Sequence, residues 1–378
     1  MPSLPSLMII SHTPHYYNKD GNIVGWEPTI REINHLLSIF DTIYHIAPLY
    51  KSVPDKATIA YTSSKIIFIP IKPTGGIGLF KKFGILFFMP YNLYKIIRMI
   101  RKVDWVHFRT PTNLGLYILP FLSIYKNKKR WIKYAGNWNQ EHPPLSYRFQ
   151  RWWLNNIQNS IVTINGKWVN QKSHLLSFEN PCITEDELKH AGLVGKNKNY
   201  HNKLNVCFVG RLEPAKGALI ILDLVKKLED VTFIDTFYIV GDGPSKNVLE
   251  NQKSNLNIKV CLMGSLSRAQ LNEIYTKCHL IILPSYASEG FPKVLAEAAS
   301  YGCVPVASNI SSIGQYIENN ISGIVIDDIS ANNLKLLLSK LSDNREKLIN
   351  MASSASKWVS LFTYSRYVNR IETEIINV

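Results

Sequence analysis

The chain is 378 residues long, 46% of its residues are hydrophobic, and its formal net charge is +15. This length exceeds one ordinary domain, and the apolar content is enough for a packed core in each of two domains, so disorder is not expected. The longest uncharged apolar segment, 110–125, contains two prolines and is shorter than the roughly 20 residues of a spanning helix, so we expect no transmembrane segment.

Short apolar runs alternate with longer helix-compatible segments in the first half of the chain. This alternation is typical of βα units and predicts a parallel sheet. A polar stretch rich in Lys and Asn, 196–203, interrupts the pattern, and we expect it at or just after a domain boundary. The expected strands of the first half are 7–11, 42–47, 66–69, 105–108, 131–134 and 160–164.

The second half repeats the alternation more clearly, with helices expected at 217–228 and 268–278. Two doubly wound α/β domains in tandem predict a ligand-binding cleft between the carboxyl ends of their sheets. We place the domains at 1–185 and 186–361 and expect a C-terminal helix, about 362–378, to pack back on the first. The expected strands are 205–209, 236–240, 258–263, 280–284, 304–307 and 323–326.

The cysteines and the amino terminus indicate the compartment. Residues 1–11 show no basic stretch ahead of an apolar run and no cleavage pattern, so a secretory signal is not expected. The cysteines are odd in number, widely spaced and mostly in apolar contexts, which predicts buried thiols in a reducing, cytoplasmic location and no zinc site. They are Cys182, Cys207, Cys261, Cys278 and Cys303.

The first strand of the second half leads into the loop Gly210-Arg211-Leu-Glu-Pro-Ala-Lys216-Gly217. A glycine at the end of a strand lets the backbone approach a ligand. Arg211 can grip a diphosphate in a forked geometry, and Lys216 can neutralise it as a point charge. The alternative is a turn with two solvated surface cations.

A second glycine loop, Gly241-Asp-Gly243-Pro244, follows the next strand. Glycines there permit a tight turn or close approach by a ligand. Since any strand-to-helix turn can use Gly and Pro, this loop alone favours an ordinary turn.

The third segment reads Glu289-Gly290-Phe291-Pro292-Lys293-Val294-Leu-Ala-Glu297. Pro292 is placed for the first turn of a helix, so Glu289 falls in the entering loop and Glu297 within the helix. The amino end of a helix offers unpaired amides and a positive dipole to phosphate oxygens. Carboxylates can accept hydrogen bonds from ribose and hexose hydroxyls. Together the three segments predict a site for a nucleoside diphosphate sugar; a chance helix with two glutamates is the alternative.

These segments resemble the retaining family 4 glycosyltransferases, which carry G-R-x(3-5)-K-G, G-x-G-P and E-x7-E motifs. The resemblance implies the GT-B fold, which has two Rossmann-like domains. The resemblance is specific over 205–326 and loose in the first half. It implies a donor, UDP-sugar by preference, whose diphosphate is held by Arg211 and Lys216. The implied donor residues are Gly25, Gly210, Arg211, Lys216, Gly241, Gly264, Leu266, Glu289, Gly290, Phe291, Pro292, Val294 and Glu297.

The resemblance also implies two elements in the first half of the chain. One is a glycine-bearing loop after the first strand, for which Gly25 is the preferred candidate. The other is a His after the fourth strand, near the acceptor. The chain reads His107-Phe108-Arg109, so His107 serves there, Arg109 replaces it, or His107 has no chemical role. Acceptor contacts are also expected from 133–138.

The implied mechanism is metal-independent front-face transfer with retention of configuration, and no cofactor. No Asp-x-Asp pair occurs in the sequence, so the cations and the helix end take the place of a metal on the leaving diphosphate. The catalytic set implied is Arg211, Lys216, Glu289 and His107. The acceptor implied is a glycan or lipid-linked glycan of cell-surface polysaccharide synthesis.

Charge is concentrated in 72–151, with fifteen basic residues against two acidic ones. Within it, 79–102 mixes bulky apolar side chains with cations. Such a stretch can lie on an anionic membrane, at the inner face for a cytoplasmic protein, or form a core helix with a solvated basic face. Two other functions remain open: a GT-B sugar-nucleotide epimerase and a basic nucleic-acid-binding protein. No nucleic-acid recognition motif is visible, so we expect no nucleic-acid partner.

Overall fold

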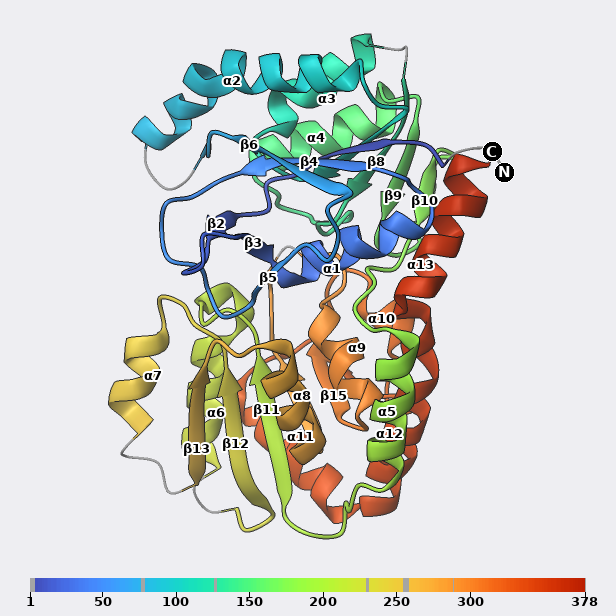
Figure 1. Cartoon of the computed structure of the whole chain (residues 1–378). Coiled ribbons are helices and arrows are strands. Elements are labelled where there is room, and N and C mark those ends of the chain that lie inside the picture. The colour runs from blue at the N-terminus through green and yellow to red at the C-terminus, as the bar shows by residue number, and fades with distance from the viewer. Residues whose placement is uncertain are drawn as a thin grey trace. The chain divides into compact units, whose positions relative to one another are not determined.

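The computed structural model describes residues 4–75, 79–125, 128–228, 231–253, 258–287 and 289–377, with the side chains of 79–83 and 253 left aside. The chain divides into two compact units (Figure 1). Unit 1 comprises residues 1–180 and 364–378, and unit 2 comprises residues 181–363. The polar stretch 196–203 therefore lies inside unit 2, and residues 181–185 belong to unit 2 as well.

Unit 1 is built on a parallel sheet, which in the described residues has seven strands in the order β10-β9-β8-β7-β1-β4-β6. Its strands are β1 (Leu7–Ile10), β4 (Ile43–Pro48), β6 (Ile66–Ile71), β7 (Trp105–Thr110), β8 (Lys129–Tyr134), β9 (Ile161–Ile164) and β10 (Leu175–Ser177). Its helices are α1 (Glu27–His35), η1 (Leu36–Ser38), α2 (Leu79–Ile100), α3 (Gly115–Ile124), α4 (Leu145–Asn156), α13 (Tyr364–Ile371) and η4 (Glu372–Ile376).

Alternating side chains of each strand bury opposite faces of this sheet, as a two-residue period requires. Met8 and Ile10 of β1 join the core under α2, α3 and α4. Leu7 and Ile9 join a second core that α1 and the C-terminal helix α13 complete. Both faces are therefore covered, which is why the strands read as continuous apolar runs.

A small antiparallel sheet follows β1 in unit 1, and the sequence did not predict it. Its strands are β2 (His15–Tyr17), β3 (Ile23–Trp26) and β5 (Thr58–Ala60), with β3 in the middle. Runs of three or four residues are too short to show a strand period. The segment expected as an open glycine loop is thus paired backbone.

Unit 2 has a second parallel sheet, with six strands in its described residues in the order β13-β12-β11-β14-β15-β16. The strands are β11 (Leu204–Val209), β12 (Ile234–Val240), β13 (Lys259–Gly264), β14 (Leu280–Leu283), β15 (Val304–Ser308) and β16 (Ile324–Ile326). The helices are α5 (Glu185–Lys196), η2 (Pro214–Lys216), α6 (Ala218–Lys227), α7 (Lys246–Lys253), α8 (Arg268–Lys277), α9 (Lys293–Ser300), α10 (Ile313–Tyr316), α11 (Ala331–Asp343), α12 (Arg345–Trp358) and η3 (Val359–Phe362).

The prediction of two Rossmann-like α/β halves is confirmed, because each unit carries a parallel sheet covered by helices. None of the helices in the described part of the chain is long and apolar enough to span a bilayer. Each of the strands predicted for unit 2 lies within two residues of an observed strand.

Candidate functional site

Two loops of unit 2 meet at the carboxyl edge of its sheet, because β11 and β12 are parallel neighbours. Gly241 adopts a φ of +137°, and a Cβ there would lie 1.9 Å from the carbonyl oxygen of Gly210. The amide of Leu212 donates to the carbonyl of Asp242 at 2.9 Å. The Gly241 loop is therefore packed against the Gly210 loop backbone to backbone, which only glycine at position 241 allows.

The loop after β14 joins the same edge, since β14 lies on the other side of β11. Gly217 has a φ of +83°, and a Cβ there would lie 2.3 Å from the carbonyl oxygen of Pro284. The amide of Tyr286 donates to the carbonyl of Ala215 at 2.8 Å. Three loops that are distant in sequence therefore form one continuous surface, which we call the donor surface (residues 210–217, 241–245, 284–287 and 289–297).

Lys216 and Glu289 form an ion pair on the donor surface. The Lys216 side chain is 14% exposed and the Glu289 side chain 33%. Burial lowers the pKa of Lys216 to about 8, while the carboxylate of Glu213 opposes the shift. Two residues predicted from separate motifs are thus in direct contact.

Arg211 lies at the open side of the donor surface. Its side chain is 66% exposed, and its Nε lies 2.9 Å from Oε2 of Glu213. This exposed cation retains its remaining guanidinium donors for a ligand. Gly210 ends β11 beside it, and the amide of Gly210 donates to the carbonyl of Val240.

The third loop enters helix α9, whose N-cap is Pro292 with no side-chain capping bond. The N-cap side chain therefore makes no bond to the first turn of α9, and the amino end of a helix carries the positive pole of its dipole, which can bind an anion. The carbonyl of Gly290 accepts from the hydroxyls of Ser311 at 2.6 Å and Ser312 at 2.9 Å. These bonds fix the turn that leads into the helix.

Phe291, which was expected to line the donor, has its side chain in the core of unit 2. Its ring is 3% exposed and packs in the core against Phe362, with ring centroids 4.6 Å apart, and against Trp358 and Tyr316. The ring anchors the loop, so only the backbone of Phe291 remains to line a ligand. Val294, one turn further, is half-buried against the same core.

Glu297 lies on the buried side of α9 and is held by two other side chains. Its Oε1 lies 2.5 Å from Nη1 of Arg268, and its Oε2 accepts from the hydroxyl of Tyr275 at 3.4 Å. Burial alone would lower the pKa of Arg268, but the carboxylates of Glu297 and Glu187 raise it. Arg268 was not predicted as a site residue; its position directly after the Ser267 cap of α8 was the available signal.

The loop expected near the base of the nucleotide precedes Arg268. Gly264 has a φ of +65°, and a Cβ built there meets no described atom within 4 Å. Leu266 is half-buried against the core of unit 2. The amide of Gly241 donates to the carbonyl of Gly264 at 2.9 Å, so this loop adjoins the second donor loop.

Gly25 lies in β3 of unit 1, directly paired with His15 of β2. A Cβ at Gly25 would lie 2.6 Å from Nε2 of His15 and 2.8 Å from Cδ1 of Ile30. Close packing inside unit 1 therefore accounts for this glycine without a ligand.

A buried chain of hydrogen bonds fixes the segment around Gly25. Nδ1 of His15 must donate to the carbonyl of Thr13 at 2.9 Å, so its Nε2 accepts from the hydroxyl of Tyr61 at 2.7 Å. The Tyr61 oxygen accepts from Nδ1 of His45 at 2.7 Å, and Nε2 of His45 accepts from Ser11 at 2.8 Å. Burial lowers the pKa of His15 to about 4 and holds that of His45 well below its usual range. Both rings are thus neutral, as the bonding pattern requires.

His107 does not lie where it could touch an acceptor. The residue is fully buried in β7, and its ring stacks on Trp131 with centroids 4.2 Å apart. Burial, followed by the nearby cation of Arg109, holds its pKa well below the usual range. A proton-transfer role for His107 finds no geometric basis.

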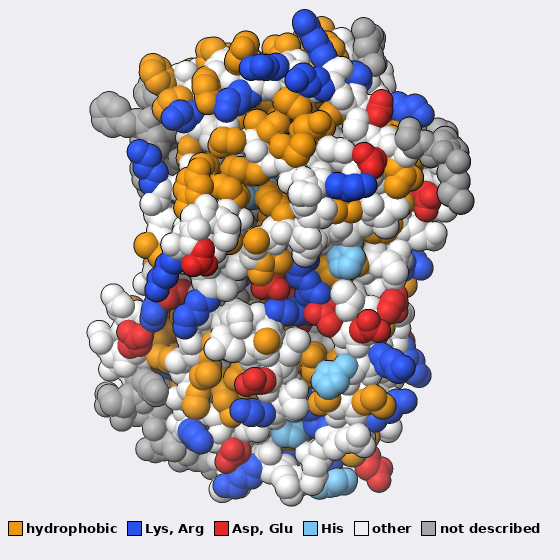
Figure 2. Space-filling model, in the orientation of Figure 1, with side chains coloured by type: hydrophobic (Ala, Val, Ile, Leu, Met, Phe, Trp, Pro, Cys, Tyr) orange, Lys and Arg blue, Asp and Glu red, His pale blue; other side chains and the backbone are white. Residues whose placement is uncertain are grey.

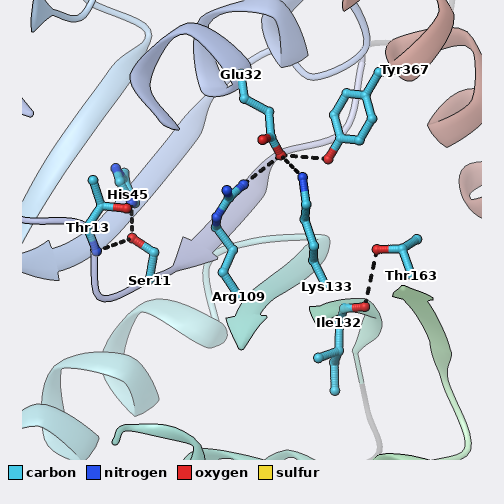
Figure 3. A network of polar contacts seen from close by, with 9 residues as sticks. All are labelled: Ser11, Thr13, Glu32, His45, Arg109, Ile132, Lys133, Thr163 and Tyr367. Carbon is cyan, nitrogen blue, oxygen red and sulfur yellow. Dashed lines mark hydrogen bonds and ion pairs between the residues drawn. The ribbon is translucent and has the colours of Figure 1, made fainter. Parts of the chain in front are cut away.

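Arg109 and Lys133, expected near the acceptor, converge instead on Glu32 of α1 (Figure 3). Oε1 of Glu32 lies 2.6 Å from Nη1 of Arg109 and 2.8 Å from Nζ of Lys133. The hydroxyl of Tyr367, on α13, donates to the same oxygen at 2.7 Å. The Glu32 side chain is 0% exposed, so two strands, α1 and α13 are joined through one buried carboxylate.

Unit 1 has a pocket of about 170 Å³ at the carboxyl ends of β1, β4, β6 and β7. His12 keeps contact with solvent there, although the surrounding protein and, to a smaller extent, Arg109 lower its pKa. The sequence analysis did not single out these residues. The pocket is lined by His12, Pro48, Tyr50, Ile71, Lys72, Thr74, Pro111, Thr112, Asn113, Leu114 and Tyr147.

Residues 193–358 match the family model described as Glycosyl transferases group 1. This range lies within unit 2 and includes all three loops of the donor surface. We refer to residues 193–358, which match this family model, as the group 1 domain. The predicted cations and acids of unit 2 therefore lie within the group 1 domain.

Two curated relatives are similar in sequence to part of this chain. The UDP-Gal:alpha-D-GlcNAc-diphosphoundecaprenol alpha-1,3-galactosyltransferase of Escherichia coli is 27% identical over 201 residues, 52% of this chain and 51% of that protein. The GalNAc-alpha-(1->4)-GalNAc-alpha-(1->3)-diNAcBac-PP-undecaprenol alpha-1,4-N-acetyl-D-galactosaminyltransferase of Campylobacter jejuni is 27% identical over 184 residues, 47% of this chain and 48% of that protein. The chain spans about half the length of the curated relatives it matches.

Solved structures extend the likeness in fold to the whole chain. HepE of Anabaena, crystallised with UDP and glucose, has a TM-score of 0.70 at 15% identity and covers 99% of this chain and 100% of its own. Sucrose-phosphate synthase of Thermosynechococcus elongatus has a TM-score of 0.71 at 15% identity, covering 99% of this chain and 98% of its own. The group 1 domain and unit 1 together thus have the GT-B fold.

Proposed function

We propose that this protein is a retaining glycosyltransferase that moves a hexosyl unit from a nucleoside diphosphate sugar, UDP-sugar by preference, to an acceptor hydroxyl. The observation that carries the proposal is the meeting of Lys216, Glu289, Arg211 and the amino end of α9 on one edge of unit 2. Two cations and a helix end suit a diphosphate, and the acid beside them suits sugar hydroxyls.

In the proposed reaction, the bond between the anomeric carbon and the β-phosphate oxygen breaks, and the acceptor oxygen bonds to that carbon on the same face. The acceptor proton passes to an oxygen of the leaving diphosphate. Lys216, Arg211 and the α9 amides stabilise the charge that develops on the diphosphate. Lys216 exchanges its contact with Glu289 for the phosphate, which frees that carboxylate for the hexose. The reaction uses neither a metal nor a cofactor.

We assign the acceptor to the pocket of unit 1 around His12. The pocket combines His12 and Lys72 with Tyr50 and Tyr147, groups that can donate to and accept from a glycan while packing on its rings. Relatives named for diphosphoundecaprenol substrates support a lipid-linked glycan as acceptor, in cell-surface polysaccharide synthesis.

A lipid-linked acceptor would favour attachment of unit 1 to the cytoplasmic face of an anionic membrane through α2. This helix packs Ile96 and Ile100 in the core and leaves Leu86 65%, Phe87 78% and Tyr94 62% exposed. The cations that follow, Arg98, Arg101 and Lys102, are exposed as well, and Figure 2 shows orange and blue side chains gathered at the top of the view, over α2. Apolar and basic side chains on one surface suit an anionic interface.

The stretch 79–102 also contains Lys81 and Lys82, but their side chains lie outside the described residues. The attachment test therefore uses Phe87→Asp and Arg98→Gln in cosedimentation with phosphatidylglycerol vesicles. Both variants should lose vesicle binding and keep donor binding. Undiminished sedimentation of Phe87→Asp would remove α2 from the interface.

The donor is tested by thermal shift with nucleoside diphosphates and their sugars, because a ligand that binds the folded state stabilises it in proportion to RT ln(1 + [L]/Kd). UDP-sugars should raise the Tm more than GDP-sugars at equal concentration. Lys216→Ala should lower kcat/KM, because it removes about 2 to 4 kcal/mol of transition-state stabilisation. The exposed Lys189→Ala serves as the matched control. A Lys216→Ala rate close to that of the control contradicts the proposal.

Release of UDP distinguishes transfer from the two alternatives. A transferase accumulates free UDP only when an acceptor is added, whereas a sugar-nucleotide epimerase converts the donor without acceptor. Salt-sensitive retention on DNA, without stabilisation by any nucleotide sugar, would instead favour the nucleic-acid-binding alternative.

A further inference from the structure

A second pocket of unit 1, of about 290 Å³, opens at the amino edge of its sheet. It lies where β8 and β9 begin, whereas the His12 pocket lies at the carboxyl ends of the strands. We call it the amino-edge pocket. It is lined by Ser123, Lys128, Lys129, Arg130, Ile157, Asn159 and Ser160.

Three consecutive cations line the amino-edge pocket, and protein contacts hold each of them. Nζ of Lys128 donates to the carbonyl of Val103 at 2.6 Å. Nη1 of Arg130 donates to the carbonyl of Tyr125 at 2.6 Å. Nζ of Lys129 lies 5.4 Å from the centre of the Trp105 ring. These partners are neutral, so they orient the cations without cancelling their charge.

The cations have no carboxylate partner within the described ranges of the chain. Asp104 acts on Lys128 from beyond ion-pair distance, and its Oδ2 is bonded by the amide and hydroxyl of Ser6. Nε of Arg130 is buried without a hydrogen-bond partner in the described structure. Burial lowers the pKa of Arg130, with no acid to offset it. Positive charge that is partly buried without a counter-ion is costly, and a bound anion would offset that cost.

We propose that the amino-edge pocket binds a phosphate group, either free or as the headgroup of a phospholipid. Arg130, Lys128 and Lys129 neutralise the charge of the phosphate, and the Asn159 amide adds a neutral donor. Ile157, 41% exposed at the rim, gives the pocket an apolar side against which a lipid chain can lie. The site uses none of the donor-surface residues, so it does not rest on the proposed function.

Isothermal titration calorimetry with inorganic pyrophosphate at low salt tests the site in the full-length chain. We expect Lys129→Gln/Arg130→Gln to weaken pyrophosphate binding at least tenfold. Lys216→Ala, which alters the donor surface, should leave pyrophosphate binding at the amino-edge pocket unchanged. Lys226→Gln/Lys227→Gln is the matched control, because it removes two consecutive exposed cations of unit 2 and changes the net charge equally. Equal losses in the two double variants would mean that only net charge matters, which overturns the proposal.

Asn159→Asp provides a second variant that keeps size and fold while placing a negative charge in the pocket. Asn159 is exposed, so this change should weaken pyrophosphate binding roughly fivefold without lowering the Tm. Unchanged affinity in Asn159→Asp overturns the site even if the double variant fails to fold.

Vesicle cosedimentation distinguishes the two sources of the phosphate. Binding to phosphatidylglycerol but not phosphatidylcholine vesicles, reduced by Asn159→Asp, identifies a lipid headgroup. Pyrophosphate binding that Asn159→Asp reduces, with vesicle binding unaffected, identifies a free phosphate compound. Absence of both binding activities in the wild-type chain overturns the proposal.

Discussion

The buried carboxylate of Glu32 should carry a large part of the stability of unit 1. One oxygen of Glu32 accepts hydrogen bonds from Arg109, Lys133 and Tyr367, and the side chain is fully buried. Glu32→Gln keeps the shape of the side chain but removes the negative charge, so two cations that are 13% and 3% exposed lose their counter-ion. Breaking a buried ion pair from one side costs about 3 to 5 kcal/mol, and we expect a loss in that range.

Urea unfolding followed by tryptophan fluorescence measures this loss. Seven of the eight tryptophans lie in unit 1, so fluorescence reports mainly on that unit. The midpoint should fall in Glu32→Gln with little change in slope, because the surface exposed on unfolding is unchanged. Because the cluster is buried, the loss should persist in 0.5 M salt, unlike that of a surface ion pair.

Two comparisons make the reasoning refutable. Glu141→Gln, an exposed acid in the same unit, should change the unfolding free energy by less than about 0.5 kcal/mol. Tyr367→Phe removes one of the three donors to Glu32 and should cost about 1 kcal/mol. If Glu32→Gln cost no more than Glu141→Gln, the buried-charge account of this cluster would be refuted.

Three further predictions concern unit 2. Because the pKa of Lys216 is lowered to about 8, its ammonium loses its proton as the pH rises through 8. The affinity for UDP, measured by calorimetry, should therefore fall over that range. Lys216→Arg should abolish this pH dependence, because a guanidinium stays charged. Gly217→Ala, with a φ of +83° and the Pro284 carbonyl 2.3 Å from the added carbon, should cost at least about 1 to 3 kcal/mol in urea unfolding, whereas Gly192→Ala, in open space on α5, should be neutral or stabilising. Arg268→Ala leaves the carboxylate of Glu297 without its buried cation and should destabilise unit 2 by about 3 kcal/mol. Arg268→Met combined with Glu297→Leu should cost less than the sum of the two single changes. Additive losses would argue against coupling between the two residues.

The parallel sheets and the donor loops could be predicted because their signals are local. Buried strands appear as apolar runs, and each donor loop follows such a run directly in the sequence. Neighbouring parallel strands bring those loops to one edge, so the contact of Lys216 with Glu289 follows from topology once the strand order is known. Short strands such as β2 and β3, in contrast, have no period to detect.

Long-range polar partners could not be predicted from the sequence. Glu32 lies 77 residues from Arg109, 101 from Lys133 and 335 from Tyr367. Nothing near Arg109 or Lys133 indicates an acid on α1, so both cations were assigned to an acceptor site. His107, one of the candidates for the acceptor site, alternates with Val106 and Phe108 on a strand that is buried on both faces, so its ring has no outward side.

The arrangement of unit 2 separates the residues that set the positions of the loops from those that meet a ligand. Gly217 and Gly241 bring the loop backbones into contact, and the ring of Phe291 anchors the turn before α9. These contacts are internal and would persist without a ligand. Arg211, in contrast, is mostly exposed and its ion pair with Glu213 engages only Nε, so its other guanidinium donors are available to a ligand. A framework that is fixed before binding loses little conformational entropy when a diphosphate arrives, which is the condition under which preorganised charges lower a reaction barrier most.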